Sequence, residues 1–496
     1  MINVSYDEFS DLAKDKGVIQ IHSEIACDFM TPVGFFSTIH KEYSFILESV
    51  ECSEQFGRFS IVGMDPKFTI KHLNNETQIQ DYDGDLLTLN EDPFEILKEL
   101  KNRYTPLNFS GLKGFYGGAV GYLAYDFIAK IEEIKLLNDD ELKVADMYFI
   151  IPKTIVLFDH VKHTVKLVKN IFIDDINNLE NLYNDALSSL DSIKQLFIKN
   201  ANLPILSLEV ADKENEFSSN MDKNEFEAIV DKAKQYIIDG EAIQIVVSQR
   251  FCMNFKGNSL DLYRALRMIN PSPYMFMINF PDFSLVGSSP EVLVKEENRK
   301  VTIRPIAGTR KRGVTVAEDQ QNQEELLNDT KEIAEHVMLV DLARNDIGRV
   351  CKGGSVNVDQ LLTIEKYSHV MHIVSNVIGE LETDKDAFDL IKAAFPAGTL
   401  SGAPKIKAMQ IIDELETTKR GPYGGAVCYF DFGGNFDSCI TIRTILFKDQ
   451  KAYIQAGAGI VFDSIPENEY YETVNKAKAM FKALQVANTI VDTKRE

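Results

Sequence analysis

The chain has 496 residues, of which 45% are hydrophobic and 26% are charged, so it can form two domains, or one large domain, around an extensive core. Its net charge of −22 argues against proteins that bind nucleic acids or anionic membrane surfaces. The six cysteines are scattered without a C-x-x-C pair, and neither a signal-peptide pattern nor an apolar stretch of about 18 residues is present. We therefore expect a cytoplasmic protein with reduced thiols.

The first part of the chain alternates short β-rich runs with turns. The glycine-rich segment 114–126 contains no phosphate-loop pattern, so we interpret it as a close backbone approach within a sheet. Helical patterns fall at 94–104 and after Asp174. The runs that predict strands are YSFILESV (43–50), RFSIVGM (58–64), FTIKHL (68–73), YFIIPKTIVLF (148–158) and TVKLVKNIFI (164–173).

A polar and acidic segment at 200–222 indicates a boundary between an N-terminal domain, 1–200, and a C-terminal domain, 223–488. The second domain begins with an amphipathic helix at 224–240 and a strand at 243–255, after which strands and helices alternate. This pattern predicts an α+β fold: a large sandwich of mixed and antiparallel sheets with outer helices.

Residues 329–350 predict a helix that places two carboxylates on an otherwise apolar arc. Asp329 with Glu332 three residues later is a helix-start signal, and Glu332 and Glu335 lie one turn apart among apolar residues that include Val337. Desolvated carboxylates repel each other, so they need a proton, a cation or access to water. Taken alone, the pattern is explained more simply by an arc whose rim faces solvent.

A second predicted helix, 464–484, repeats this spacing. It opens with a capping pattern and a proline at 464–467, and Glu469 and Glu472 are again three residues apart, with Lys476 one turn later. If the two helices face each other, their four carboxylates form an all-oxygen site. Such a site suits a hard dication, most plausibly Mg²⁺.

Four small-residue turns lie beside reactive side chains in the C-terminal half, at 287–291, 303–309, 395–405 and 455–459. The third turn leads into a helix whose unpaired N–H groups could hold an anion. Each turn alone has a purely structural interpretation, but together with the four glutamates they indicate a site.

Several motifs together resemble the chorismate-utilising enzymes, and specifically the large subunits of anthranilate synthase. They extend over nearly the whole chain: ILES (46–49), GRFSIVG (57–63), PSPYMF (271–276), GSSPE (287–291), RPIAGTR (304–310), AEHVMLVDLARND (334–346), YSHVMHIVS (367–375), PAGTLSGAPK (396–405), GPYGGAV (421–427) and ENEYYETVNKA (467–477).

The resemblance implies a Mg²⁺-dependent lyase of tryptophan biosynthesis. Such an enzyme adds ammonia to C2 of chorismate with loss of the 4-hydroxyl, and then eliminates pyruvate to give anthranilate. The resemblance implies Glu335 and Glu472 as metal ligands, supported through water by Glu332 and Glu469. It implies substrate contacts for Gly308, Thr309, Tyr423, Arg443, Gly457, Ala458, Gly459 and Lys476.

The resemblance also implies the proton-transfer groups. A general acid must protonate the departing hydroxyl, and Glu291 matches that position, whereas His372 and Thr399 match the base that removes the C2 proton. His336 and His369 have no such match, so we interpret them as core residues. For feedback inhibition by tryptophan, the matching pocket residues are Ser49, Pro273, Tyr274 and Met275.

Two positions distinguish close relatives. Isochorismate-forming members carry lysine where this chain has Gln244, and aminodeoxychorismate synthases carry lysine at Ala307, so the resemblance favours anthranilate. Component I of aminodeoxychorismate synthase is the alternative, and a catalytically inactive binding protein on the same fold is a second one. Because Cys252, Cys351 and Cys428 lie in no G-x-C-x-G motif, we expect a separate glutamine amidotransferase subunit, component II, to supply ammonia.

Overall fold

The computed structural model describes residues 2–49, 57–108, 114–198, 203–206, 217–366 and 370–493. His369, which the sequence assigns to the core, lies outside these ranges. Within them, no helix is long and apolar enough to cross a membrane.

The N-terminal part of the chain supplies eight of the described strands and four α-helices. The strands are β1 (Gly17–Ala26), β2 (Phe45–Glu48), β3 (Phe59–Leu73), β4 (Glu76–Asp81), β5 (Leu86–Leu89), β6 (Gly118–Leu123), β7 (Met147–Asp159) and β8 (Thr164–Ile173). The helices are α1 (Tyr6–Leu12), α2 (Pro32–Ile39), α3 (Pro93–Arg103) and α4 (Leu179–Ile198), with 3₁₀ turns η1 (Ala13–Asp15) and η2 (Tyr125–Lys130).

The C-terminal part supplies the other described elements. Its strands are β9 (Ser218–Ser219), β10 (Gln244–Asn254), β11 (Tyr274–Asn279), β12 (Ser284–Ser289), β13 (Val292–Glu297), β14 (Lys300–Ile303), β15 (Ile306–Lys311), β16 (Asn357–Lys366), β17 (Val370–Glu380), β18 (Gly402–Ala403), β19 (Ala426–Asp431), β20 (Phe436–Ile440), β21 (Thr444–Lys448) and β22 (Lys451–Ile460). Its helices are α5 (Lys223–Ile238), α6 (Ser259–Ile269), α7 (Val316–Asn328), α8 (Thr330–Gly348), α9 (Ala387–Ala394), α10 (Gly398–Ser401), α11 (Lys405–Leu415) and α12 (Pro466–Thr493).

The strands of the described residues form one hydrogen-bonded network of 22, so the predicted α+β class with a large sheet is confirmed. The ladders are antiparallel throughout. The network crosses the predicted boundary twice, because β2 pairs with β11 and β6 pairs with β19. The division into two domains remains a prediction, but their strands share one network.

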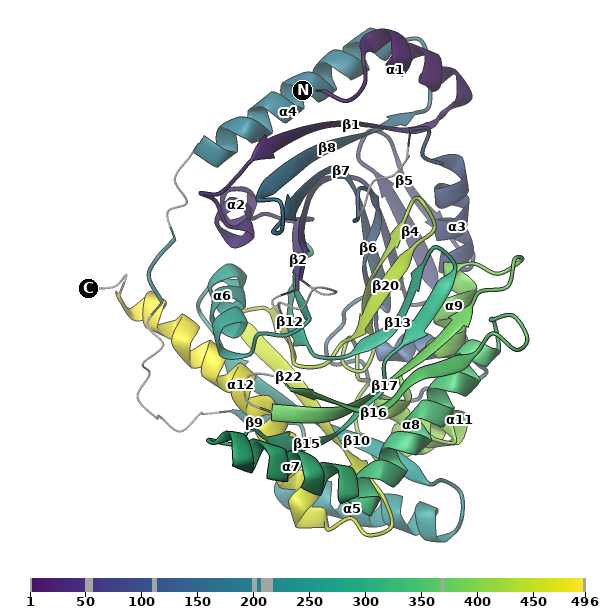
Figure 1. Ribbon diagram of the computed structural model, residues 1–496, viewed down its shortest axis with the longest axis vertical. Coiled ribbons are helices and arrows are strands. Elements are labelled where there is room, and N and C mark those ends of the chain that lie inside the picture. The colour runs from purple at the N-terminus through teal and green to yellow at the C-terminus, as the bar shows by residue number, and fades with distance from the viewer. Residues whose placement is uncertain are drawn as a thin grey trace.

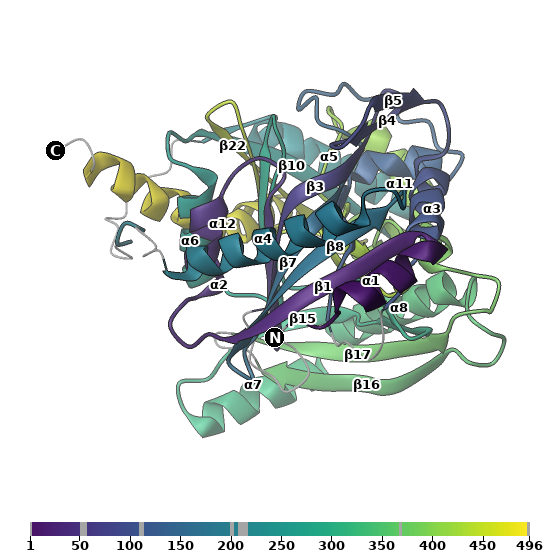
Figure 2. The ribbon, with the colours of Figure 1, turned by 90° about the horizontal axis from the view of Figure 1, so that it is seen from above.

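Helices cover the sheet at both ends of the molecule. Helices α1 and α4 lie over β1 and β8 at the N-terminal end, and α5, α7, α8 and α11 lie around the strands at the other end (Figures 1 and 2). One core joins α2, α4, α6 and α12 to β1, β2, β10 and β22, and a second joins α3, α8 and α9 to β6, β14, β17 and β19. A smaller core packs α5 and α11 on β10 and β22. These cores fix the elements that carry the candidate site.

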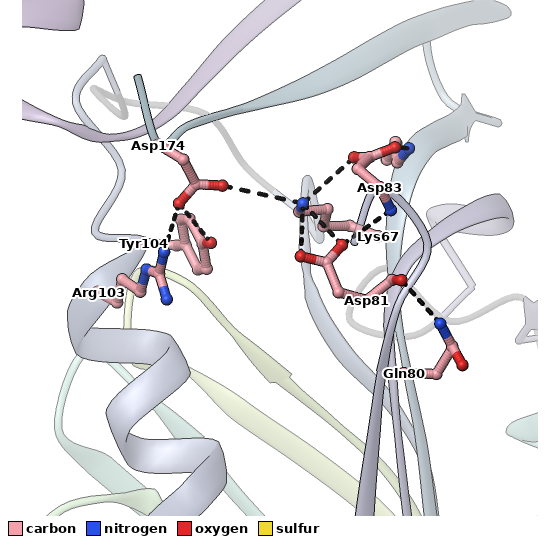
Figure 3. Close-up of polar contacts among 8 residues, drawn as sticks. Lys67, Gln80, Asp81, Asp83, Arg103, Tyr104 and Asp174 are labelled. Carbon is pink, nitrogen blue, oxygen red and sulfur yellow. Dashed lines mark hydrogen bonds and ion pairs between the residues drawn. The ribbon is translucent and has the colours of Figure 1, made fainter. Parts of the chain in front are cut away.

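A buried lysine ties the N-terminal elements together. Lys67 on β3 is 4% exposed, and its Nζ lies 2.8 Å from Asp81, 3.2 Å from Asp83 and 3.9 Å from Asp174 (Figure 3). Asp174, which follows β8, also accepts a hydrogen bond of 2.7 Å from Arg103 at the end of α3. Because a buried charge is tolerated only with partners, this cluster locks β3, β4, β8 and α3 to one another.

The two predicted glutamate helices are present. Asp329 caps α8 by accepting hydrogen bonds from the backbone N–H groups of Lys331 and Glu332, as expected for an N-cap acid. Val337, which the sequence places on the apolar arc, is instead 42% exposed, because the buried stripe is narrow and follows His336, Val340, Ala343 and Ile347. Helix α12 runs well beyond residue 484.

Candidate active site

The four glutamates lie on two helices, each of which packs on strands of the network. Helix α8 packs on β15 and β17, and α12 packs on β22 (Figure 1). Burial raises the pKa of Glu332, and the charge of Glu335 raises it further; burial likewise raises the pKa of Glu469, with a smaller contribution from Glu472. Lys331 acts electrostatically on both Glu332 and Glu469, so the two carboxylate pairs border one region.

Each carboxylate pair already has nearby protein donors. The Gln244 amide donates to Glu335 at 3.3 Å, Lys476 lies 2.7 Å from Glu472, and Arg310 lies 3.7 Å from Glu332. In the part of the chain that the structure describes, no group of three or more His, Cys, Asp or Glu side chains lies close enough to hold an ion. The four predicted carboxylates are therefore two separate pairs and not a closed cage. Their all-oxygen donor set fits Mg²⁺, which usually takes one or two carboxylates and completes its shell with water and substrate.

Glu291 follows β12 and receives a hydrogen bond from the candidate residue Thr399. Thr399 Oγ1 donates to Glu291 Oε1 at 3.1 Å, which brings α10 against the turn between β12 and β13. Burial raises the pKa of Glu291 to about 7, while the Thr399 hydrogen bond and the charge of Lys476 oppose this shift. Glu291 and Thr399 also line a cavity of about 40 Å³, together with Arg304 and Asp346. A carboxyl group with this pKa can donate a proton near neutral pH.

His372 lies on β17 opposite Thr309 of β15, where a β-bulge follows Ala307. Its Nδ1 lies 3.0 Å from the Gly308 carbonyl and 3.1 Å from Thr309 Oγ1. Donation to the Gly308 carbonyl selects the tautomer with the lone pair on Nε2. Burial lowers the pKa of His372, the Gly308 carbonyl opposes this, and Arg443 lowers it further, which favours the neutral form of the imidazole.

Gly308 occupies a position that only glycine tolerates well. Its φ is +66°, and an added Cβ would lie 3.0 Å from Leu326 and 3.3 Å from the Glu332 carboxylate. The bulge on β15 therefore brings the Gly308 backbone beside the first carboxylate pair, while the same backbone orients His372.

The predicted substrate-binding residues of β22, α12 and the turn between β20 and β21 contact one another. Arg443 donates to the Lys476 carbonyl at 2.8 Å, and Lys476 Nζ donates to the Gly457 carbonyl at 2.9 Å. An added Cβ on Gly457 would lie 2.8 Å from the Tyr423 hydroxyl, and one on Gly459 would lie 2.7 Å from the amide of Gln244, so both positions require close approach. Ala458 packs its side chain into the α5 and α11 core, so only its backbone can face a substrate.

The predicted inhibitor-pocket residues are also neighbours. Ser49 directly follows β2, in which Glu48 pairs with Met275 of β11. Tyr274, which follows Pro273, donates from its hydroxyl to Asp437 at 3.0 Å. The Ser49 Oγ is buried and makes no hydrogen bond within the described residues. The structure thus places Ser49 next to the start of β11.

Some residues near the site were not predicted from the sequence. Arg310 faces the N-terminal turn of α8, where it also lies 2.7 Å from Asp329, and Lys405 pairs at 2.9 Å with Asp346 in the wall of the Glu291 cavity. Arg420 is completely enclosed beneath Tyr423. In the sequence, these residues could have been noticed only because they lie in or beside the recognised motifs. An ion pair between segments that are far apart in the chain leaves no sequence pattern.

Comparisons with known proteins place the chain in a family. The model of the chorismate binding enzymes matches residues 43–482. The chain is 46% identical over 495 residues to anthranilate synthase component 1 of Acetivibrio thermocellus, covering 99% of this chain and 100% of that protein. It is 44% identical over 492 residues to that of Aquifex aeolicus (strain VF5), covering 98% of each.

A solved structure agrees with these relatives. The crystal structure of anthranilate synthase component I from Streptococcus pneumoniae TIGR4 matches with a TM-score of 0.78 at 37% identity, covering 92% of this chain and 98% of that one. The fold and the sequence thus lead to the same group of proteins. The chain belongs to the chorismate-binding enzyme family, among the anthranilate synthase component 1 proteins.

Proposed function

We propose that the chain converts chorismate and ammonia to anthranilate and pyruvate in a Mg²⁺-dependent reaction. The observation that carries the proposal is that an acid, Glu291, and an imidazole, His372, are linked through two cationic side chains that contact each other. Glu291 is influenced by Lys476, His372 is influenced by Arg443, and Arg443 donates to the Lys476 carbonyl. An acid and a base whose environments separate their pKa values are the groups that a two-step elimination needs.

We assign substrate binding to the two cationic residues of this set. Arg443 and Lys476 would bind the carboxylates of chorismate, Arg443 through its forked donors. Tyr423 and the backbones of Gly308, Thr309 and 457–459 would complete the binding surface. The net charge of −22 makes these local cations necessary for a dicarboxylate substrate.

Glu335 and Glu472 would hold Mg²⁺, with Glu332 and Glu469 acting through water. When bound, the ion would neutralise a carboxylate of the substrate. The carboxylate pairs described above supply oxygen donors on both α8 and α12, so a ligand between them would contact both helices.

In the first step, ammonia forms a bond to C2, the two ring double bonds shift by one position, and the C4–O bond breaks. Glu291 protonates the departing oxygen so that water leaves, and the added ammonium group loses a proton. In the second step, His372 removes the C2 proton, the electron pair completes the aromatic ring, and the bond between ring carbon C3 and the ether oxygen breaks. The three-carbon unit leaves with that oxygen as enolpyruvate, which takes up a proton to become pyruvate. Each positioned proton transfer contributes about 10²- to 10⁴-fold in rate. Gln244 and Ala307 stand where relatives with other products carry lysine, which supports anthranilate as the product.

The test is the reaction of the purified chain with chorismate, Mg²⁺ and ammonium, followed by chromatography of the products. We expect anthranilate and pyruvate in equal amounts, and no turnover when glutamine replaces ammonium, because a separate amidotransferase subunit supplies ammonia. A product that carries the new nitrogen at C4 instead of C2 would favour aminodeoxychorismate synthase component I. Unchanged chorismate would show a binding protein without this activity.

A further inference from the structure

A buried ion pair lies directly behind the candidate site. Arg420 is 2% exposed, and its Nε donates to Glu416 Oε2 at 2.9 Å while its Nη2 donates to Glu416 Oε1 at 2.6 Å. Burying two charges costs free energy even when they are paired, and a hydrophobic pair of the same volume is often as stable. The pair therefore calls for a reason beyond stability.

The remaining donors of Arg420 bind two elements that carry residues of the candidate site. Nη1 donates to the Leu400 carbonyl at 2.7 Å, and Leu400 directly follows Thr399 on α10. Nη2 donates to the Val246 carbonyl at 2.6 Å, two residues after Gln244 on β10. One guanidinium thus fixes the distance between the strand that holds Gln244 and the helix that holds Thr399.

The same ion pair also contacts the turn that carries Tyr423. The Arg420 guanidinium lies 5.7 Å from the centre of the Tyr423 ring and 4.4 Å from that of Tyr125. Glu416 in turn accepts hydrogen bonds of 2.8 Å from both the backbone N–H and the hydroxyl of Ser248 on β10. The contacts of the pair therefore reach three walls of the site: α10, β10 and the turn after Arg420.

We propose that Glu416 and Arg420 are positioning residues, which hold Thr399 against Glu291 and Gln244 against Glu335 without touching the substrate. The proposal rests on the proposed function, since it assigns these residues a role in that reaction. Arginine is required because its planar fork serves a carboxylate and two carbonyls at once, whereas the ammonium of lysine has three donors around a single nitrogen.

The first experiment compares Arg420→Lys with the wild-type chain in ammonium-dependent consumption of chorismate, at a temperature at which both are folded by circular dichroism. We expect kcat/KM to fall about 100-fold, the usual effect of displacing catalytic groups by about 1 Å. The matched control is Arg264→Lys on α6, where the arginine also binds one carboxylate, Asp261 at 3.0 Å, and one carbonyl, that of Pro204 at 2.7 Å. The control should leave kcat/KM unchanged, because neither of these partners belongs to the site.

The second experiment is a double-mutant cycle with Thr399→Val. If Arg420 acts by holding α10, Thr399→Val should lower kcat/KM much less in the Arg420→Lys background than in the wild-type background, because the hydrogen bond to Glu291 is already lost. The proposal would be overturned if the effects of Thr399→Val and Arg420→Lys on kcat/KM were independent and simply multiplied. It would also be overturned if Arg420→Lys had the kcat/KM of the wild-type chain.

If Arg420→Lys does not fold, Glu416→Gln replaces it in the same cycle. This variant keeps the size of the side chain but removes the charge and one of the two acceptor oxygens that orient the Arg420 guanidinium toward the Leu400 and Val246 carbonyls. We expect the same loss of coupling to Thr399. If Thr399→Val lowers kcat/KM as much in the Glu416→Gln background as in the wild-type background, the positioning role is wrong. Wild-type protein that leaves chorismate unchanged would instead overturn the proposed function.

Discussion

The Glu291 carboxyl gives the site a measurable dependence on pH. Its pKa of about 7 means that the protonated form, which we propose as the general acid, is lost as the pH rises through neutrality. We predict that kcat/KM for chorismate consumption falls with a midpoint near pH 7. Thr399→Val should move this midpoint to higher pH. The hydrogen bond from Thr399 stabilises the carboxylate form of Glu291, so its removal raises the pKa of Glu291 further.

The control for this pH profile is Ser401→Ala. The Ser401 hydroxyl is on the same short helix but donates to the Ala397 carbonyl, so its loss should leave the midpoint unchanged. A midpoint in Thr399→Val at or below the wild-type value would contradict the assignment of Glu291 as the acid that Thr399 holds.

The role proposed for His372 allows the two chemical steps to be separated by experiment. We predict that His372→Met consumes chorismate and accumulates an aminated, non-aromatic intermediate that still carries the enolpyruvyl group, because elimination loses a base worth about 10²- to 10⁴-fold in rate. Chromatography of the reaction mixture measures this. The matched control is His336→Met: His336 is fully buried, and its Nε2 lies 2.6 Å from Ser375 Oγ, so its replacement should reduce both steps alike. Anthranilate formed at the wild-type rate by His372→Met would rule out the assigned role.

At the scale of secondary-structure elements, helices α8 and α12 hold the four glutamates that we assign to Mg²⁺. We predict that Mg²⁺ without chorismate raises the melting temperature of the wild-type chain, since a ligand that binds only the folded state stabilises it. Glu335→Gln and Glu472→Gln should abolish both this shift and turnover. Asp341→Asn, on the exposed face of α8 where Asp341 pairs with Arg344 at 2.9 Å, should retain both. Full activity in excess EDTA would contradict the metal assignment.

The sequence predicted elements well wherever a strong local pattern existed. The start of α8 at its Asp329 cap and the strand over 243–255 are confirmed by α8 and β10. The fifteen-residue strand β3 was predicted as two shorter runs, because Pro66 lies at an irregularity in its pairing with β7 and interrupts the pattern. Helix α12 extends beyond its predicted end at residue 484, because no capping signal in its last turns marks where the helix stops.

The candidate site was predictable only through recognised motifs. Spacing alone gave the two carboxylate pairs, but not whether α8 and α12 lie close enough to share an ion. Glu416 and Arg420 are four residues apart with a loop between them, which in sequence looks like an ordinary surface pair. Only the packing of α10, β10 and Tyr125 around them makes the pair buried, and such long-range packing has no local signal.

At the scale of the whole molecule, the contact between β2 and β11 gives a prediction about regulation. Ser49 lies at the end of β2, and its neighbour Glu48 is held by Tyr263 at 2.6 Å and by Arg267 at 3.0 Å on α6. A ligand that binds beside Ser49 would therefore bias the placement of strands from both parts of the chain. We predict inhibition by tryptophan at a site distinct from that of chorismate.

Ser49→Ala should raise the tryptophan concentration for half-inhibition about tenfold, because one hydrogen bond to a charged group is worth about 1.5 kcal/mol or more. Ser37→Ala on α2, whose hydroxyl donates to the Gly34 carbonyl, serves as the control and should leave inhibition unchanged. If millimolar tryptophan neither slows the wild-type enzyme nor raises its melting temperature, the pocket has no regulatory role.

The pairing of β6 with β19 has a consequence for how the protein is made. On the ribosome, Gly118 emerges long before its partner Asp431 is synthesised, and β2 likewise waits for β11. During that interval the nascent chain carries unpaired strand edges that can join other chains. We therefore expect chains that terminate before β19 to aggregate, and the yield of soluble protein in cells to depend on chaperones that shield these edges until translation ends.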